Sequence, residues 1–545
     1  MSLQFITGNS GNGKTKYLFN RIVKEAKANP RDNYLVIVPE QFTMQTQRQL
    51  VDLSENKAIM NIDVLSFKRL AYRVFDELGI TNLTVLEETG KNLVLRKLAA
   101  QEADKLGVIG RNLNRIGYIS EVKSLLSELV QYNISPEELG RYIASGRLSD
   151  TLSDKLKDVL VLYEAFEKFM QDKYITAEEI LNVLSNVAEE SAILRNSVIA
   201  FDEFTGFTPI QNQLIKKLFV ISKKISVTLT IDCREDIFKS RGMQELFDMP
   251  KRTVKSLTEM AAFYGIEVEE PIILDKNYRL AENEGLSFME QQLFRKRRCS
   301  FKKVPKHIHI DCLRDPKQEL TKIARRINEL VRNENLRYRD IAIVTGDVNI
   351  YAGYVREIFD KYNIPYFIDA TQEILFHPFI EFIRSIPDIA AQNFSADAVF
   401  RFLRCGFSEL LGSEIDVLEN YVLACGVRGK SAWDKKWVRL PKHKAGYDLE
   451  LLNQSREYIM ELLKPVYQVF SDKKSTVKDY VLAIYKLIVL LDIPDKLAKK
   501  EQALLDAGDQ TASKEYGQIY KIVMQLFEKY VAGVGGGVMG GGGVI

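Results

Sequence analysis

The sequence predicts an α/β protein made of two units with parallel sheets, each interrupted by a large helical insertion. Three observations predict this class. Short β-rich apolar runs recur in two clusters, helix-length segments separate them, and a glycine-rich loop follows the first run. Runs that are apolar throughout fit strands buried on both faces, as in parallel sheets, better than half-exposed antiparallel strands.

The first cluster predicts a five-stranded unit with strands at 3–6, 34–38, 62–65, 198–201 and 227–231. The stretch 76–190 lies between the third and fourth of these runs. It carries apolar residues at helical spacing and predicts a helical insertion. The first unit is therefore expected to comprise residues 1–75 and 191–275.

The second cluster predicts the start of a second unit at 307–375, with strands at 307–310, 341–344 and 366–368. A basic junction at 276–306 leads into it. The strand-poor region 376–530 predicts a second helical insertion. The last fifteen residues, 531–545, contain eight glycines and are expected to be disordered, because they offer little core contact to offset backbone entropy.

The composition excludes several classes of protein. The 76 Lys and Arg residues nearly balance 73 Asp and Glu, so nucleic-acid contacts are expected only from local patches. The five cysteines show neither a CxxC pair nor metal-ligand spacing, and no apolar run approaches the roughly 18 residues of a membrane span. A reduced, cytoplasmic protein without a membrane segment is expected.

A phosphate-binding loop is the clearest chemical signal. The sequence GNSGNGKT lies between the first predicted strand and a helix with an apolar face, and it matches G-x-x-x-x-G-K-[ST] completely. Its backbone N–H groups and its lysine suit the phosphates of ATP, and its threonine hydroxyl suits Mg²⁺. The expected nucleotide-binding residues are Gly8, Asn9, Ser10, Gly11, Asn12, Gly13, Lys14 and Thr15.

A phosphate loop also needs a carboxylate for the metal and another for the attacking water, usually at the end of a neighbouring strand. Asp202 and Glu203 follow the predicted strand 198–201 directly. Asp202 is therefore expected to bind Mg²⁺ together with Thr15, and Glu203 to act as the general base. An ordinary acidic pair closing a strand is the alternative reading.

Several segments resemble motifs of superfamily 1 helicases. FDEFTGFTPIQ (201–211) is similar to their second motif, and LDKNYR (274–279) to their fourth, whose arginine reaches the γ-phosphate. The resemblance implies this catalytic role for Arg279. IDCREDIFKSRG (231–242) matches the third motif only in part, with Glu235 and Asp236 where helicases have Gln and Ser. The adenine-reading glutamine is also missing, so nucleotide binding without efficient motor action is implied.

The AddB family, the B subunits of bacterial AddAB helicase-nucleases, fits more of the chain. Resembling segments are VPEQFTMQTQ (38–47), VLSFKRLAYRVF (64–75), FDEFTGFTPIQ, YRDIAIVTGD (338–347), NIPYFIDATQEILFHPFIEFIRS (363–385) and LENYVLACGVRGKSAW (418–433). The resemblance covers about residues 1–530. It implies two RecA-like helicase-type domains in a heterodimer with an AddA-like subunit. That complex resects double-strand DNA ends with ATP and recognises Chi sequences for homologous recombination.

The family's nuclease motif, G-I-I-D-R-I-D, and its four iron–sulfur cysteines do not occur in this sequence. The resemblance therefore implies the N-terminal half of a longer protein. The iron–sulfur cluster is expected only in the missing C-terminal part, and nuclease activity is not expected of this chain.

Contacts to single-stranded DNA are expected from the loops after the second, third and fourth strands, and from the basic junction. Polar or aromatic side chains there suit base edges, base faces and phosphates. For each one, a packing or solvated role is the plainer alternative. The candidates are Gln41, Thr43, Phe67, Arg69, Phe207, Arg295, Arg297 and Arg298.

Two other functions stay open beside the AddB-like one. An autonomous superfamily 1 helicase would need the fifth and sixth motifs from a longer product. A non-enzymatic scaffold that binds ATP for structure is favoured over the helicase by the altered third motif. A nucleotide kinase is more distant, because the DEF sequence and LDKNYR have no place in one. The recognised Chi sequence, the turnover rate and independent folding do not follow from the sequence.

Overall fold

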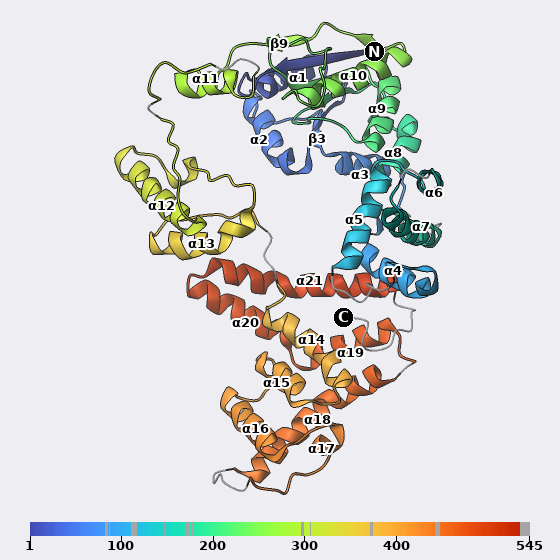
Figure 1. The fold of residues 1–545 in the computed structure, drawn as a ribbon, viewed down its shortest axis with the longest axis vertical. Helices are drawn as coiled ribbons and strands as arrows, with labels where there is room; N and C mark the ends of the chain where they lie inside the picture. Colours follow the sequence, from blue (N-terminus) through green and yellow to red (C-terminus); the bar gives the residue numbers. More distant parts are fainter. Residues whose placement is uncertain are drawn as a thin grey trace. The chain divides into compact units, whose positions relative to one another are not determined.

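A computed structural model describes most of the chain in two compact units, residues 1–307 and 308–545 (Figure 1). The described residues are 1–81, 85–86, 88–108, 110, 117–145, 148–170, 175–176, 178–295, 299–305, 307–370, 374–441, 447–472 and 474–534.

The first unit contains a seven-stranded sheet in which every pairing is parallel. The strand order is β3-β2-β6-β7-β1-β8, and β9 also pairs with β1. All five strands expected in this unit are present, and β8 and β9 are additional. The strands are β1 (Ser2–Gly8), β2 (Tyr34–Ile37), β3 (Ile62–Leu65), β6 (Val198–Phe201), β7 (Lys224–Thr230), β8 (Glu267–Val268) and β9 (Ile272–Leu274).

Both faces of this sheet are covered. Successive residues of a strand point to opposite faces, and each face packs in a core of its own. Ile6, Val36 and Ala200 belong to a core with helices α1 (Lys14–Ala28) and α2 (Thr43–Leu53). Their neighbours along the same strands belong to a second core on the other face. Its helices are α3 (Phe67–Leu78), α8 (Ile180–Val187), α9 (Pro209–Ile221) and α10 (Asp248–Phe263). The unit also contains α11 (Glu284–Gln292).

A helical segment between β3 and β6 has a core of its own, as the apolar spacing predicts. This core is separate from those of the sheet and includes Leu95, Leu126 and Leu162. Its elements are α4 (Glu88–Gln101), α5 (Tyr118–Gln131), α6 (Pro136–Ala144), α7 (Asp150–Met170) and the short parallel pair β4 (Val85–Leu86) and β5 (Ile175–Thr176).

In the second unit, the three expected strands are not formed. Residues 307–310, 341–344 and 366–368 are described, but none is assigned to a strand. Several of their apolar side chains are largely exposed, among them Ile310, Val344 and Phe367. A parallel strand is stable only when its backbone is paired and its faces are covered, and neither condition is met here. What remains of the expected α/β arrangement is the packed pair α12 (Pro316–Asn333) and α13 (Val348–Lys361).

The rest of the second unit is helical, as expected for 376–530. Its helices are α14 (Pro378–Ala391), α15 (Ala396–Arg404), α16 (Gly412–Cys425), α17 (Lys430–Asp434), α18 (Leu449–Ser471), α19 (Val477–Leu490), α20 (Ile493–Asp506) and α21 (Gln510–Val534). Helix α21 extends into the expected tail as far as Val534, and residues 535–545 lie outside the described part. Within the described part, no helix combines the length and apolar character needed to cross a membrane.

Candidate nucleotide site

The phosphate loop connects the central strand β1 to helix α1. Strand β1 ends at Gly8, and α1 begins at Lys14. Gly11 and Gly13 have φ values of 87° and 79°, a left-handed conformation that favours glycine. The loop therefore places backbone N–H groups and the N-terminus of α1 at one edge of the sheet, where phosphate oxygens are readily bound.

The two expected carboxylates lie beside this loop. The hydroxyl of Thr15 donates to Oδ1 of Asp202 at 3.2 Å and contacts Oε1 of Glu203 at 3.4 Å. Asp202 follows β6, two strands away from β1, so the parallel order of the sheet brings both strand ends to the same edge. Glu203 has a φ of 63°, an uncommon conformation that turns the chain sharply after the strand.

The residues present fit a magnesium ion. Asp202 is only 1% exposed. Its Oδ1 also accepts from Thr228, whereas its Oδ2 is buried with no hydrogen-bond partner among the described residues. Burial raises the pKa of Asp202, and nearby Glu203 acts in the same direction. An unpartnered carboxylate oxygen beside a hydroxyl is the kind of oxygen donor set that Mg²⁺ uses with nucleotide phosphates.

Lys14 is held in the loop by two carbonyl groups. Its Nζ donates to the carbonyl oxygens of Gly8 at 3.1 Å and Asn9 at 3.0 Å. Burial lowers the pKa of Lys14, while Glu203 and Asp202 oppose that change. A cation that is desolvated in this way is stabilised when a phosphate group comes close to it.

A second segment, which follows β9, contacts the phosphate loop from the other side of β1. Leu274, the last residue of β9, is in register with Gly8. The backbone N–H groups of Tyr278 and Arg279 point to the carbonyl oxygen of Gly11, at 3.0 and 3.4 Å. The expected phosphate-sensing residue Arg279 is therefore adjacent to the loop.

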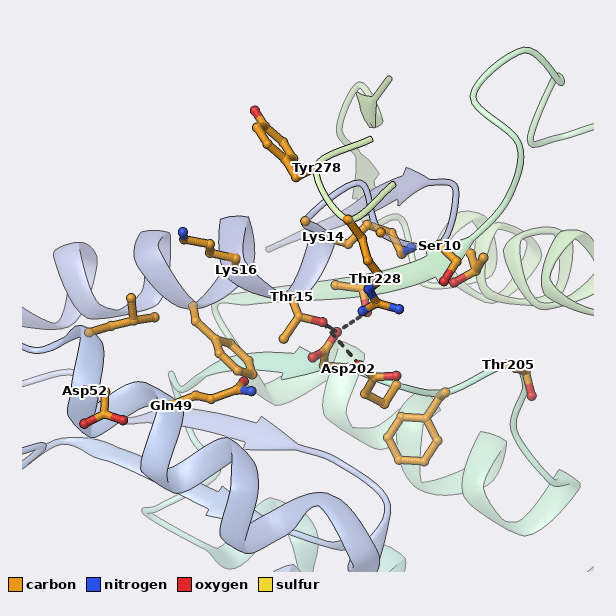
Figure 2. Close-up of a pocket in the computed structure, with 18 residues that line it drawn as sticks. Ser10, Lys14, Thr15, Lys16, Gln49, Asp52, Asp202, Thr205, Thr228 and Tyr278 are labelled. Carbon is orange, nitrogen blue, oxygen red and sulfur yellow. Dashed lines mark hydrogen bonds between the residues drawn. The ribbon is translucent and has the colours of Figure 1, made fainter. Parts of the chain in front are cut away.

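These elements surround a cavity of 660 Å³, in the size range of a nucleotide site. Figure 2 shows Thr15 and Asp202 facing each other in it, with Tyr278 on one side and Gln49 and Asp52 on another. Sequence reasoning missed Tyr278 as a lining residue. The sequence signal that could have indicated this role is the position of Tyr278 directly before Arg279 in the matched segment LDKNYR. Tyr278 is 65% exposed, and the ammonium of Lys276 lies over its ring at 5.1 Å from the centroid.

The candidate DNA residues of three loops gather at the same edge of the sheet. Glu40 joins the first two loops, because it accepts hydrogen bonds from Ser66 and from Nε of Arg69, the latter at 3.2 Å. Gln41 and Arg69 are exposed. Thr43 is buried at 3% exposure, and its hydroxyl donates to the carbonyl oxygen of Glu40. Of these polar candidates, Gln41 and Arg69 are open to a ligand in this structure.

The structure contradicts the prediction that Phe67 is open to a base. Phe67 is 7% exposed and belongs to the core beneath the sheet. Its ring packs on Phe201 at 5.8 Å and Phe204 at 5.6 Å between centroids. Phe207 is partly buried in the same aromatic cluster. The reason is local: Phe67 begins α3 and lies on the apolar face of this strongly amphipathic helix.

Arg295 has protein partners in place of an open position. Its Nε donates to Asp232 at 2.9 Å, its guanidinium lies over the ring of Phe247, and its side chain is 12% exposed. Binding of Arg295 to DNA phosphates would require these contacts to break. Arg297 and Arg298 lie outside the described residues.

The segment similar to the third helicase motif is fixed by ion pairs. Asp232 is also bound by Arg234 at 2.6 Å. Burial by itself raises the pKa of Asp232, but the hydrogen bonds from Arg234 and the charge of Arg295 hold it at about 2. Glu235 pairs with Lys251 at 2.6 Å. Asp236 pairs with Lys239 at 3.1 Å, so both residues that replace Gln and Ser are ion-paired within this segment or with α10.

Comparison with known proteins gives a consistent family. A family model described as AddB, N-terminal, matches residues 5–290. The chain is 38% identical over 549 aligned positions to the B subunit of the ATP-dependent helicase/deoxyribonuclease of Lachnoclostridium phytofermentans, covering 99% of this chain and 48% of that protein.

Proteins of the same name from other bacteria are also similar. Identity is 32% with that of Caldanaerobacter subterraneus and 31% with that of Clostridium acetobutylicum, in each case over 98% of this chain and 47% of the relative. The chain spans about half the length of the curated relatives it matches. With the family model covering more than half of its residues, the chain belongs to the AddB family.

Proposed function

We propose that this chain is the ATP- and single-stranded-DNA-binding part of an AddB-type subunit, working with an AddA-like subunit in a helicase-nuclease that resects double-strand DNA breaks. One observation carries the nucleotide-binding part of the proposal. The Thr15 hydroxyl lies 3.2 Å from the buried Asp202 carboxylate, in a cavity lined by a complete phosphate loop.

In this account ATP lies with its phosphates over residues 8–15 and its base toward the exposed ring of Tyr278. Lys14 moves from the Gly8 and Asn9 carbonyl groups to the terminal phosphates. Mg²⁺, held by Thr15 and Asp202, neutralises phosphate charge when bound. Glu203 orients a water molecule, and Arg279 contacts the γ-phosphate.

DNA binding is proposed at the same edge of the sheet. Gln41 and Arg69, whose side chains are exposed, follow β2 and β3 at this edge, just as the phosphate loop follows β1.

Chi recognition, the AddA-like partner and double-strand ends are proposed from the family, because the similar proteins are named as subunits of a helicase/deoxyribonuclease. The five cysteines are all free, which supports the proposed cytoplasmic location.

A non-motor role of the nucleotide is favoured over an autonomous helicase. The ion pairs of Asp232 and Glu235 link the altered third-motif segment to neighbouring residues. ATP binding that stabilises or switches the protein, with little turnover by this chain, agrees with that geometry.

Photo-crosslinking with an azido-ATP analogue tests the proposal. We expect labelling that requires Mg²⁺, is blocked by excess ATP, and maps to peptides lining the 660 Å³ cavity. Labelling that excess ATP does not reduce, or that maps only to the second unit, would refute the proposed site. Pull-down with a tagged AddA-like partner tests the heterodimer separately, and failure to retain the folded chain would contradict that assignment.

A further inference from the structure

Residues Leu274–Arg279 form a strap over the phosphate loop. They leave the sheet at the same end as that loop, because β9 is parallel to β1 with Ile6 opposite Ile272 and Gly8 opposite Leu274. The side chain of Asn12 donates to the carbonyl oxygen of Leu274 at 2.6 Å. The strap is therefore bound to the loop at its first residue.

Asn277 joins the strap to the loop a second time. Its Nδ2 donates to the carbonyl oxygen of Ser10 at 3.0 Å, and its Oδ1 accepts from the backbone N–H of Leu280 at 2.9 Å. One side chain thus fixes the turn of the strap and its distance from the loop. Tyr278 and Arg279, the two residues that enter the nucleotide cavity, lie between these contacts.

The fit between strap and loop is close at Gly11. A Cβ atom on Gly11 would lie 2.8 Å from Cβ of Arg279 and 2.9 Å from Oδ1 of Asn277, closer than such atoms approach. With its φ of 87°, Gly11 therefore admits the strap both by its conformation and by its lack of a side chain.

We infer that Asn277 is a positioning residue: it locks the strap on the phosphate loop so that Arg279 reaches the terminal phosphate of a bound nucleoside triphosphate. This inference rests on the proposed ATP-binding function. In the proposed function Arg279 contacts the γ-phosphate, which ADP lacks, so Asn277 governs the preference for ATP over ADP more than the binding of both.

The test is a double-mutant cycle on ATP and ADP affinity. The dissociation constants of both nucleotides with Mg²⁺ are measured for the parent, Asn277→Ala, Arg279→Ala and the double variant. We expect Asn277→Ala to reduce the ATP-over-ADP preference about tenfold, which is the upper end of the net contribution of a hydrogen bond between neutral groups. In the Arg279→Ala background, Asn277→Ala should have little further effect, because both act through one contact.

Asn283→Ala is the matched control. Asn283 also accepts a backbone N–H, that of Leu286 at 3.0 Å, but within the first turn of α11. It should leave the preference unchanged. Asn277→Asp keeps an acceptor for Leu280 and loses the donor to Ser10. It should behave like Asn277→Ala, and it carries the test if the alanine variant fails to fold in a thermal scan.

The outcomes separate this inference from the proposed function. A parent that binds no ATP would refute the function itself. A parent that binds ATP and ADP equally, an Asn277→Ala variant with the parent's preference, or losses that simply add in the double variant would each overturn the role of Asn277 and leave ATP binding intact.

Discussion

The Thr15 hydroxyl and the Asp202 carboxylate, 187 positions apart in the chain, lie 3.2 Å from each other. The first belongs to the phosphate loop after β1 and the second follows β6. Parallel strands bring their carboxyl ends to one edge of the sheet, so the contact brings together a glycine-rich loop and a buried carboxylate from distant segments.

Asp202→Asn should weaken Mg²⁺-dependent ATP binding and stabilise the ligand-free protein at neutral pH. The loss in affinity should be at least the roughly tenfold seen when residues supporting metal sites are changed. The stabilisation follows from linkage. Burial raises the pKa of Asp202 above its ordinary value of 3.8, so the folded state holds a proton more tightly than the unfolded state.

The charged carboxylate therefore lowers the free energy of unfolding as pH rises from about 3.8 through the raised pKa. Thermal unfolding of parent and Asp202→Asn without nucleotide, measured from pH 4 to 8, checks the sign. The advantage of the variant should grow with pH. A variant that loses its advantage as pH rises would contradict the account of Asp202.

Phe67→Ala and Arg69→Ala should differ in kind. Phe67 is buried in the aromatic cluster, so its truncation should cost about 3–5 kcal/mol of the free energy of unfolding. Arg69 makes an exposed ion pair with Glu40, worth about 1 kcal/mol or less, so its loss should leave stability nearly unchanged.

DNA affinity, measured in the assembled heterodimer on Chi-containing and scrambled single strands, should fall for Arg69→Ala. A preferential loss on the Chi strand would assign Arg69 to base contact, and an equal loss on both strands to phosphate contact. Arg69→Ala with parental affinity for both strands would remove Arg69 from the proposed surface.

ATP hydrolysis by this chain alone should be slow or absent. Arg279 is the one arginine among the described residues that line the cavity, and a second arginine acting as a finger contributes about 10³–10⁵ in rate. Phosphate release assays with and without single-stranded DNA check this. Strong DNA-stimulated turnover without any partner would show that the non-motor reading is wrong.

The chain alone should not degrade DNA. Within its described residues, no group of three or more His, Cys, Asp or Glu side chains is arranged to hold a metal ion. A labelled strand incubated with Mg²⁺ or Mn²⁺ should stay intact. Metal-dependent cleavage that a substitution within residues 1–530 abolishes would refute this prediction.

The parts that the sequence predicts correctly are those encoded locally. The glycine spacing of residues 8–15 specifies a loop geometry, and continuous apolar runs specify buried strands, so the first sheet and the Thr15–Asp202 edge follow. The burial of Phe67 does not follow, because a phenylalanine at the start of a helix can face either core or solvent.

The remaining features depend on distant contacts. Strands β8 and β9 are two and three residues long, too short for a periodic signal, and Asn277 meets Ser10 across 267 positions. The runs at 307–310, 341–344 and 366–368 have strand-like composition, but strand formation also needs a paired neighbour that composition alone does not supply.

The central claim is that the loop 8–15 binds ATP, and the affinity of Lys14→Ala for MgATP tests it most directly. Lys24→Ala is the control, since Lys24 is an exposed lysine on the same helix and does not line the cavity. A fluorescent ATP analogue titrated into parent and both variants should show parental affinity for Lys24→Ala. For Lys14→Ala the account predicts a loss of at least about tenfold, the worth of a charge-assisted hydrogen bond. Parental affinity of Lys14→Ala would contradict it.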